Sequence, residues 1–354
     1  MVTLGGNEVI GNLKLSIICA TYNHERYIKY ALDSIIMQQV DFEYEVLIGE
    51  DCSTDKSRLI LEKYERMYPE KFKIFYRDKN LGVENNFKDL YERARGEYLI
   101  VLETDDFWIS RKKLQIEIDY LDKHPECLAV AHRCIMVDEN NKILNLKYPE
   151  CTNKNYTLSK FNKELLPGQT TTIMFRNYYS RNIGINTSLC TKNEYMIGPG
   201  DKRKAFMLVA QGKIVCLNQY LSAYRYVEKG GSSYTANLST RSFIDAYNEK
   251  VIFVKFAKNE IDCKKAVDVA EYQLVSFIIR SMLKKEWLFK FKEGLEIIRN
   301  TNHKYKNIVI SVASIIKSII LKPFGQNLMY KKMNSKKIEG IYENSDFINK
   351  FTKS

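Results

Sequence analysis

The first hundred residues alternate between short apolar runs and segments with helical spacing, and this alternation restricts the fold more than any other feature. Each apolar run is rich in β-branched residues and ends in polar residues, as a buried strand does. The apolar runs cover residues 14–20, 44–49, 73–77 and 97–102, and the helical segments cover residues 26–39, 56–67 and 84–95. Strands that alternate with helices form a parallel sheet with helices on both faces. The sequence therefore predicts an α/β domain.

Polar loops follow three of the predicted strands, at residues 20–25, 49–55 and 103–107. In open α/β sheets, ligands bind beyond the carboxyl ends of the strands. Because parallel strands place these ends along one edge, we expect the three loops to lie close together. Ser53-Thr54-Asp55 can also cap the helix that follows.

The acidic cluster Glu103-Thr104-Asp105-Asp106 directly follows the fourth predicted strand. Burial of neighbouring carboxylates is costly unless a cation neutralises them. Carboxylate oxygens are suitable ligands for Mg²⁺ or Mn²⁺, so Glu103, Asp105 and Asp106 are candidate metal ligands. The alternative is that the two aspartates only cap a turn before Trp108. The position of the cluster, at a strand end with two other polar loops nearby, favours the metal site.

The pattern changes after residue 128 and again near residue 235. The predicted elements are strands 128–137, 171–176 and 214–217, helix 202–211, and helices 242–257, 266–283, 287–298 and 307–321. Residues 236–354 contain 22 Lys+Arg and 12 Asp+Glu, a net charge of +10 out of +12 for the whole chain. We therefore predict an α/β domain over residues 1–235 and a basic helical region over residues 236–354. The charge favours an anionic partner such as a membrane surface, a phosphorylated acceptor or nucleic acid.

Cysteine spacing and hydropathy argue against several classes of protein. None of the eight cysteines lies in a CxxC pair, so neither a zinc site nor a redox motif is predicted. The N-terminus lacks the charged start, apolar run and cleavage site of a signal peptide. The longest apolar stretch, residues 308–321, is shorter than the about 20 residues of a spanning helix and contains Lys317. We expect a cytoplasmic protein and leave open a peripheral contact with the inner face of the cell membrane.

Seven segments, taken in order, resemble the family 2 inverting glycosyltransferases, which have the GT-A fold. These segments are SIICATYNHERYI, EVLIGEDCSTDKS, RDKNLGVENNF, GEYLIVLETDDFW, GQTTTIMFRN, GDKRKAFML and YRYVEKGGSS, and together they span about residues 13–235. The variant with GED and ETDDFW is similar to bacterial enzymes that build capsule, lipopolysaccharide or other surface glycans. The resemblance implies a GT-A mixed sheet with flanking helices, followed here by a C-terminal helical extension.

The resemblance implies that the first two strand-end loops bind the nucleobase. Ala20 and Thr21 would contact the base, and Asp51 would accept a hydrogen bond from its ring N–H. The alternative for Asp51 is a helix cap, although Ser53 and Asp55 are better placed for capping.

The same resemblance separates the roles of the acidic residues. Asp105 would bind the ribose, and Asp106 would ligate the metal that bridges the diphosphate. Glu103 stands where the family usually has an Asp, and its direct role stays open.

Asp201 and Arg225 are the candidates outside the strand-end loops. The resemblance implies that Asp201 is the general base that takes the proton of the acceptor hydroxyl, a role that contributes about 10²–10⁴-fold in rate. The alternative is an N-cap of helix 202–211, and both roles can hold together. Arg225 would neutralise phosphate, with a surface ion pair as the alternative. Relatives often have a His two residues later, where this chain has Val227.

Two of the four histidines bear on the predicted sheet. His24 lies in the first strand-end loop, where we expect solvent exposure. His132 lies in an apolar strand and is predicted to be a satisfied core residue.

The predicted activity is transfer of a sugar from a nucleoside diphosphate donor, UDP-linked by resemblance, to a glycan or lipid-linked acceptor. Mn²⁺ or Mg²⁺ would be the cofactor, and the anomeric carbon would be inverted. One alternative is a catalytically inactive relative that serves as a membrane-associated scaffold; the retained Asp51, Asp105, Asp106 and Asp201 argue against it. A second is a nucleic-acid-binding protein, but no RNP, KH or zinc-finger signature is present, so no nucleic acid is expected.

Overall fold

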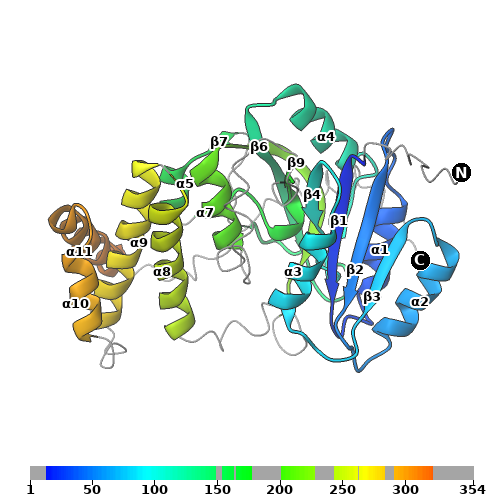
Figure 1. Cartoon of the computed structure of the whole chain (residues 1–354), viewed down its shortest axis with the longest axis horizontal. Helices are drawn as coiled ribbons and strands as arrows, with labels where there is room; N and C mark the ends of the chain where they lie inside the picture. The colour runs from blue at the N-terminus through cyan, green and yellow to red at the C-terminus, as the bar shows by residue number, and fades with distance from the viewer. Residues whose placement is uncertain are drawn as a thin grey trace, which may run out of the picture.

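The structure is a computed structural model that describes residues 13–148, 154–162, 165–177, 201–227, 243–261, 263–283 and 291–321. Side chains at a few helix ends, including that of Asp201, lie outside the description. A nine-stranded sheet occupies one end of the molecule, and four C-terminal helices occupy the other (Figure 1).

The first half of the sheet matches the predicted alternation closely. Its elements are β1 (Leu15–Thr21), α1 (Ile28–Ile36), β2 (Tyr44–Glu50), α2 (Ser57–Met67), β3 (Phe72–Tyr76), α3 (Val83–Arg93) and β4 (Tyr98–Val101). Strands β3, β2, β1 and β4 lie side by side in this order, and all of their pairings are parallel. The chain therefore steps outward from β1 to β3 and then returns to the other side of β1. This reversal makes the carboxyl ends of β1 and β4 the switch point at which open α/β sheets bind ligands.

The second half of the sheet is mixed. Its elements are β5 (Phe107–Trp108), α4 (Lys113–Lys123), β6 (Cys127–Val137), β7 (Lys154–Tyr156), α5 (Leu158–Asn162), a 3₁₀ turn (Thr170–Thr172), β8 (Ile173–Arg176), α7 (Asp201–Gln211) and β9 (Lys213–Arg225). The sheet continues from β4 through β8, β6 and β9 to β5, and β7 pairs with β9. The predicted GT-A-like mixed sheet is confirmed.

Strand β9 is longer than the predicted strand 214–217. The prediction stopped where Asn218 and Gln219 interrupt the apolar run, and both side chains are exposed. The parallel register between β6 and β9 shifts at this point, between Ala131 and Arg133, as at a β-bulge. Pairing with β6 therefore carries the strand past its polar residues to Arg225.

Alternate residues of the central strands face two separate cores, as the period of a strand requires. On one face, Ile17 and Val46 pack with Leu32 of α1, Leu61 of α2 and Leu114 of α4. On the opposite face, α3 packs on β1 and β2, and α7 packs on β6 and β9, with α5 and α8 packed against α7. The sheet is thus the middle layer of three.

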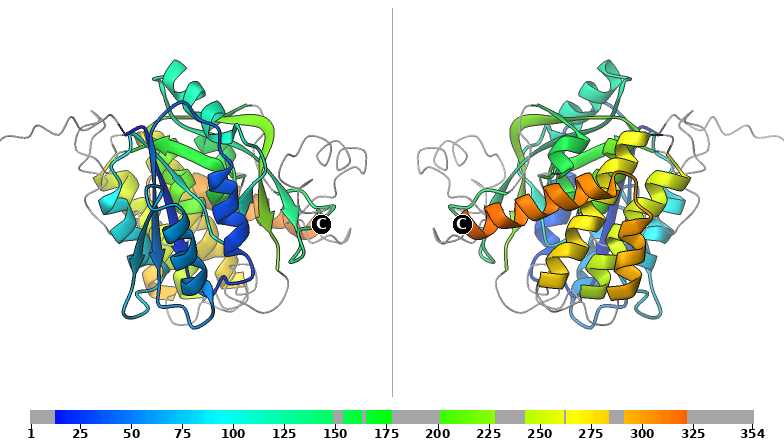
Figure 2. Two further views of the ribbon diagram at one scale, coloured as in Figure 1. Left: turned by 90° about the vertical axis from the view of Figure 1, so that its right-hand side faces the viewer. Right: turned by 90° about the vertical axis from the view of Figure 1, so that its left-hand side faces the viewer.

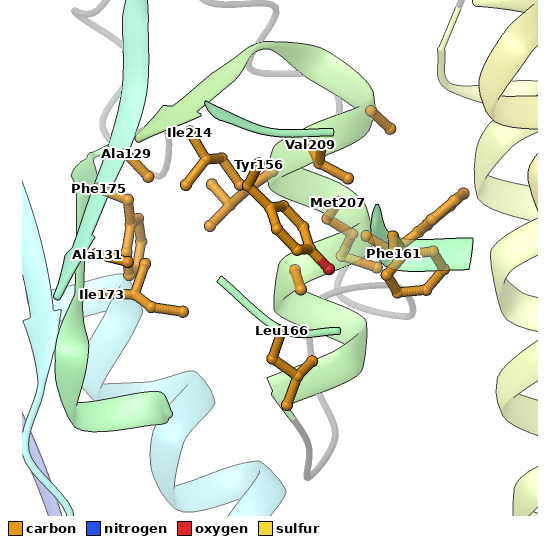
Figure 3. Close-up of a cluster of buried hydrophobic side chains, with 14 of the residues drawn as sticks. Ala129, Ala131, Tyr156, Phe161, Leu166, Ile173, Phe175, Met207, Val209 and Ile214 are labelled. Carbon is orange, nitrogen blue, oxygen red and sulfur yellow. The ribbon is translucent and has the colours of Figure 1, made fainter. Parts of the chain in front are cut away.

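Figure 3 shows the second core where the mixed half of the sheet meets α5 and α7. Phe175 of β8 and Ile214 of β9 lie on the sheet side of Tyr156, and Phe161 and Met207 close the cluster on the helical side (Figure 3). These side chains come from β7, α5, β8, α7 and β9, which follow one another along the chain. The same core also contains Ile18 of β1 and Phe253 of α8, so it joins segments that are distant in the sequence.

The C-terminal region is helical, as predicted. It contains α8 (Phe243–Asn259), α9 (Lys264–Leu283), α10 (Phe291–Arg299) and α11 (Lys304–Leu321). The predicted boundary at residue 235 lies outside the described residues. Helices on its two sides share one core, because Phe206 of α7 stacks on Phe253 of α8 with ring centroids 4.8 Å apart. Among the described helices, none combines the length and hydropathy needed to cross a bilayer.

Candidate active site

The hydroxyl of Thr104 ties the carboxyl ends of β1 and β4 together. Its Oγ1 donates to the carbonyl of Ala20 at 3.2 Å and accepts from the Thr21 hydroxyl at 3.1 Å. His24 Nδ1 lies 2.7 Å from the same hydroxyl. The structure thus places two of the three predicted loops in contact at the switch point. It also corrects the expectation for His24, which is half-buried because this contact holds it against the acidic loop.

The loops after β1 and β2 hold each other in a specific shape. Asn23 and Cys52 adopt positive φ angles of 56° and 59°, a region that non-glycine residues rarely occupy. The Asn23 side chain accepts a 2.8 Å hydrogen bond from the Thr54 amide, and the Ser53 hydroxyl accepts one from the Asn23 amide. Asp55 Oδ1 accepts from the Ser57 amide at the start of α2. Of the predicted cap residues, Asp55 accepts from the first amide of the helix although the N-cap position is Lys56, whereas Ser53 joins the two loops.

Asp51 anchors the turn that precedes α3. Its Oδ1 accepts from the Leu81 amide at 2.7 Å and its Oδ2 from the Gly82 amide at 3.0 Å. Gly82 has a φ of 79°, which suits glycine. The Asp51 residue is 3% exposed. Its observed role, the support of a neighbouring loop at the sheet edge, was missed in the sequence, where Asp51 was weighed as a nucleobase ligand or a cap of α2.

Gln169 joins two residues of the acidic cluster and was also missed. Its Nε2 donates to Glu103 Oε2 and to Asp106 Oδ2, each at 2.8 Å. Its Oε1 accepts from the Thr171 amide at 2.8 Å, so the amide orientation is set by the 3₁₀ turn before β8. Gln169 therefore holds the carboxylates of Glu103 and Asp106 side by side. Its sequence signal was weak: a polar residue in the segment GQTTTIMFRN, directly before an apolar strand.

The acidic loop itself is a tight turn. The Asp106 amide donates to the Glu103 carbonyl at 2.9 Å, and Phe107 and Trp108 then pair with β9 as strand β5. The alternative interpretation of the cluster, a turn before Trp108, is therefore compatible with a ligand site. Asp105 sits at the tip of the turn and is half-buried, whereas Asp106 is 1% exposed.

Arg225 lies beneath the acidic loop. Its Nε donates to the Asp105 carbonyl, one terminal nitrogen to the Asp138 carbonyl and the other to Asn141 Oδ1, at 2.8, 2.9 and 2.8 Å. The guanidinium also stacks over Tyr27, 4.4 Å from the ring centroid.

The buried position of Arg225 argues against a surface ion pair. The residue is only 1% exposed, and burial lowers the pKa of its guanidinium. Its donors are directed at protein oxygens, and the predicted phosphate contact stays a prediction. Arg225 clamps the acidic loop to the segment after β6.

The electrostatics of the cluster favour a cation. Burial, together with the negative charges of Asp105 and Glu103, raises the pKa of Asp106 well above its ordinary value. A divalent cation would offset this cost by neutralising the carboxylates.

The fit to a metal is partial. Among the described residues, no group of three or more His, Cys, Asp or Glu side chains is arranged to hold a metal ion. The predicted site with three carboxylates is therefore not preformed. The two carboxylates joined by Gln169 fit the other common arrangement, in which one or two carboxylates and substrate phosphates share a Mg²⁺ ion.

Asp201 is the first residue of α7, which begins one residue earlier than the predicted helix 202–211. Its side chain lies outside the described side chains, so the predicted role as general base stays a prediction.

A cluster of buried ionisable side chains contacts Trp108, the second residue after the acidic turn. Lys113 Nζ lies 2.5 Å from Glu117 Oε2 and 4.5 Å from the centroid of the Trp108 ring. His132 Nε2 lies 3.6 Å from Glu117 Oε1, and all three side chains are fully buried. His132 is a core residue, as predicted, but its hydrogen bonding is only partly satisfied. Its Nδ1 lies 2.9 Å from the Arg133 carbonyl, whereas its buried Nε2 has no hydrogen-bond partner.

The segment that contains these residues resembles a known protein family. Residues 16–182 match the sequence model of "Glycosyl transferase family 2". This segment, slightly less than half of the chain, carries the sequence pattern of that family. The match spans β1 to β8 and includes the acidic turn and Gln169, so the predicted resemblance is confirmed.

Individual relatives align over short segments. An uncharacterised protein of Mycobacterium tuberculosis is 41% identical over 126 residues, 36% of each chain. The Staphylococcus aureus poly(ribitol-phosphate) beta-N-acetylglucosaminyltransferase TarS is 33% identical over 116 residues, 32% of this chain and 19% of TarS. The chain thus aligns with about a third or less of the length of these relatives.

Comparison of structures extends the likeness in fold over most of the chain. A crystal structure of a TarS fragment in complex with UDP-GlcNAc superposes with a TM-score of 0.56 at 21% identity, covering 86% of this chain and 81% of the fragment. At this identity the likeness shows the fold alone. It confirms the predicted GT-A architecture.

Proposed function

We propose that this protein is a metal-dependent inverting glycosyltransferase of family 2 that uses a nucleoside diphosphate sugar, most simply a UDP-sugar. The observation that carries the proposal is the pair of carboxylates, Glu103 and Asp106, held together by Gln169 at the switch point of the sheet. This edge is where open α/β sheets bind nucleotides. TarS, which shares the fold, has been solved in complex with UDP-GlcNAc.

In the proposed site, the loops after β1 and β2 hold the nucleoside. Ala20 and Thr21 border the nucleobase, and Asp51 accepts from its ring N–H with the lone pairs that the Leu81 and Gly82 amides leave available. Their mutual hydrogen bonds make these loops a preformed surface.

The acidic turn holds the diphosphate end of the donor. Asp106 is the proposed ligand of Mn²⁺ or Mg²⁺, with Glu103 beside it, and Asp105 at the tip of the turn binds the ribose. When bound, the metal supplies Lewis-acid stabilisation of the departing diphosphate. The Arg225 amide and the Gln169 side chain hold the Asp106 carboxylate in place before the donor arrives, and Gln169 also holds Glu103.

Asp201, at the start of α7, is the proposed general base for the acceptor hydroxyl. Attack on the side of the sugar opposite the diphosphate inverts the anomeric carbon. The proposed acceptor is a glycan or a lipid-linked molecule of the bacterial surface. The names of two relatives support the surface assignment: TarS acts on poly(ribitol-phosphate), and GgaB of Bacillus subtilis, 31% identical over 119 residues, is a minor teichoic acid biosynthesis protein. In this proposal the donor domain covers residues 1–235, the basic helical region covers residues 236–354, and the protein works on the cytoplasmic side of the membrane.

Calorimetric titration of UDP and of a panel of nucleotide sugars, with and without Mn²⁺, tests the proposal. We expect UDP to bind only with the metal and one UDP-sugar to be hydrolysed slowly. In Asp106→Asn, metal-dependent UDP affinity should fall at least about 100-fold, because the variant removes a charged ligand. Asp119→Asn, on the exposed face of α4, is the matched control and should bind like the wild type.

Two results would contradict the proposal. If UDP bound equally well with and without the metal, the acidic turn would not be the metal-binding site of the donor. Failure of every nucleotide sugar to bind in the presence of Mn²⁺ would favour the inactive scaffold instead.

A further inference from the structure

Helix α11 carries an apolar stripe that faces away from the protein. Along it, Tyr305, Val309, Val312 and Ile316 are 76%, 67%, 41% and 50% exposed. Their spacing of four, three and four residues places them on one face of the helix. Ile310, 43% exposed, lies at the edge of the stripe.

The opposite face of α11 is the one that packs. Asn307, Ser311 and Ile315 on this face are buried. Ser314, at its border, accepts a hydrogen bond from Arg280 of α9. Figure 2 shows α11 lying across the other C-terminal helices at the end of the molecule remote from the parallel strands. The stripe is therefore on the outermost layer of the described structure.

A stripe of this kind needs an apolar partner. Single exposed apolar residues are common on protein surfaces, but contiguous ones mark sites of interaction. Over its 18 residues α11 contains no Asp or Glu and three lysines, Lys304, Lys306 and Lys317. Lys306 is exposed on the flank of the stripe, next to Ile310.

Two partners could cover the stripe, a second copy of the chain or a lipid surface, and the positive charge of the C-terminal region favours the lipid surface. Pairing of two copies through α11 would bring together two regions that each carry a net charge of +10 over residues 236–354. An anionic lipid surface offers acyl chains for the stripe and negative headgroups for the lysines.

We propose that the stripe of α11 docks on an anionic bilayer, with the helix axis parallel to the membrane plane. The flanking lysines then face the headgroup layer, and the α/β unit projects from the membrane. This inference rests on the proposed function only in that a lipid-linked acceptor would lie at the same surface. Vesicle binding is measured without donor or acceptor, so each proposal can fail while the other stands.

The test is co-sedimentation of the full chain with vesicles of phosphatidylcholine containing about 30% phosphatidylglycerol, compared with pure phosphatidylcholine. We expect strong binding to the anionic vesicles alone. The double variant Val309→Ser/Val312→Ser should bind about ten-fold more weakly. A second variant, Lys304→Gln/Lys306→Gln, should lose most of its preference for anionic lipid. Leu59→Ser, which removes an apolar side chain 62% exposed on α2, is the matched control and should bind like the wild type.

Each other outcome counts against the proposal. Absence of vesicle binding by the full chain would overturn it, as would equal binding of the stripe variant and the control. If the stripe variant instead converts an oligomer to a monomer and leaves vesicle binding intact, the occupant is a second copy. Circular dichroism and urea unfolding of the same preparations show whether each variant is folded.

Discussion

The backbone N–H of Arg225 donates a 2.8 Å hydrogen bond to Asp106 Oδ1, across 119 positions of sequence. Phe107 and Trp108, which follow the acidic turn, pair with Ala223 and Ser222 just before Arg225. Strand β9 therefore holds the acidic turn by both its backbone and a side chain. The orientation of the proposed donor-binding carboxylates depends on this pairing at the edge of the sheet.

Replacement of Gln169 with Leu should separate the two carboxylates. The variant leaves buried Asp106 without its Oδ2 donor and the Thr171 amide without its acceptor. An unsatisfied buried polar group costs about 1–3 kcal/mol, and urea unfolding of the metal-free protein should show this loss. Metal-dependent UDP affinity should fall as well, since the ligands are no longer preorganised. The exposed Gln39→Leu is the control, and equal stability of the two variants would show that Gln169 has no such role.

Replacement of Arg225 with Lys should destabilise the protein even without ligand. Lysine cannot reach the Asp105 carbonyl, the Asp138 carbonyl and Asn141 at once, because it lacks the planar fork of donors. We expect a loss of about 1–3 kcal/mol in the free energy of unfolding. Arg26→Lys changes an arginine side chain that is 61% exposed and should be neutral. If Arg225→Lys kept the stability of the ligand-free protein but lost affinity for UDP, the result would favour the phosphate contact predicted for Arg225.

Replacement of Asp201 with Asn should separate catalysis from helix capping. Asn caps helices about as well as Asp, so a capping role would leave turnover unchanged. A general base cannot be replaced by an amide, and we expect turnover to fall about 10²–10⁴-fold with UDP affinity retained. Rates with the donor and acceptor identified by the nucleotide-sugar panel, together with calorimetry, measure both quantities.

The buried His132 should make stability depend on pH. Burial and the neighbouring Lys113 ammonium hold the pKa of His132 well below its ordinary value of 6.5. The folded protein therefore keeps His132 neutral, whereas the unfolded chain binds a proton below about pH 6.5. The unfolded state binds more protons there, so this contribution to stability is lost as pH falls through 6.5.

Glu117, which faces His132, acts in the opposite direction. Burial raises its pKa from 4.5 to about 7, so the stability that its retained proton provides is lost as pH rises from 4.5 toward 7. Glu117 and Lys113 are both present in His132→Gln, and comparison with this variant isolates the histidine. Between about pH 7.5 and 5.5 the wild type should lose about 1.4 kcal/mol more than the variant. If the wild type and His132→Gln lost the same free energy of unfolding between the two pH values, the result would argue that His132 is protonated in the folded protein.

Local pattern determined the parallel half of the sheet and the position of the acidic turn. Continuous apolar runs and helical spacing are properties of short segments, so strands such as Leu15–Thr21 and Tyr98–Val101 could be placed within about two residues. The short β5 and β7 strands were not predicted, because two or three residues carry no period.

The sequence by itself determined which carboxylates stand at the strand ends, and the family that residues 16–182 match. The tertiary structure decided what surrounds them. Gln169 reaches Asp106 across 63 positions, and Arg225 is buried under the turn, a position that its sequence context did not predict. No local pattern encodes such contacts, because hydrogen-bond partners are chosen by the three-dimensional packing of strands that are distant in the chain.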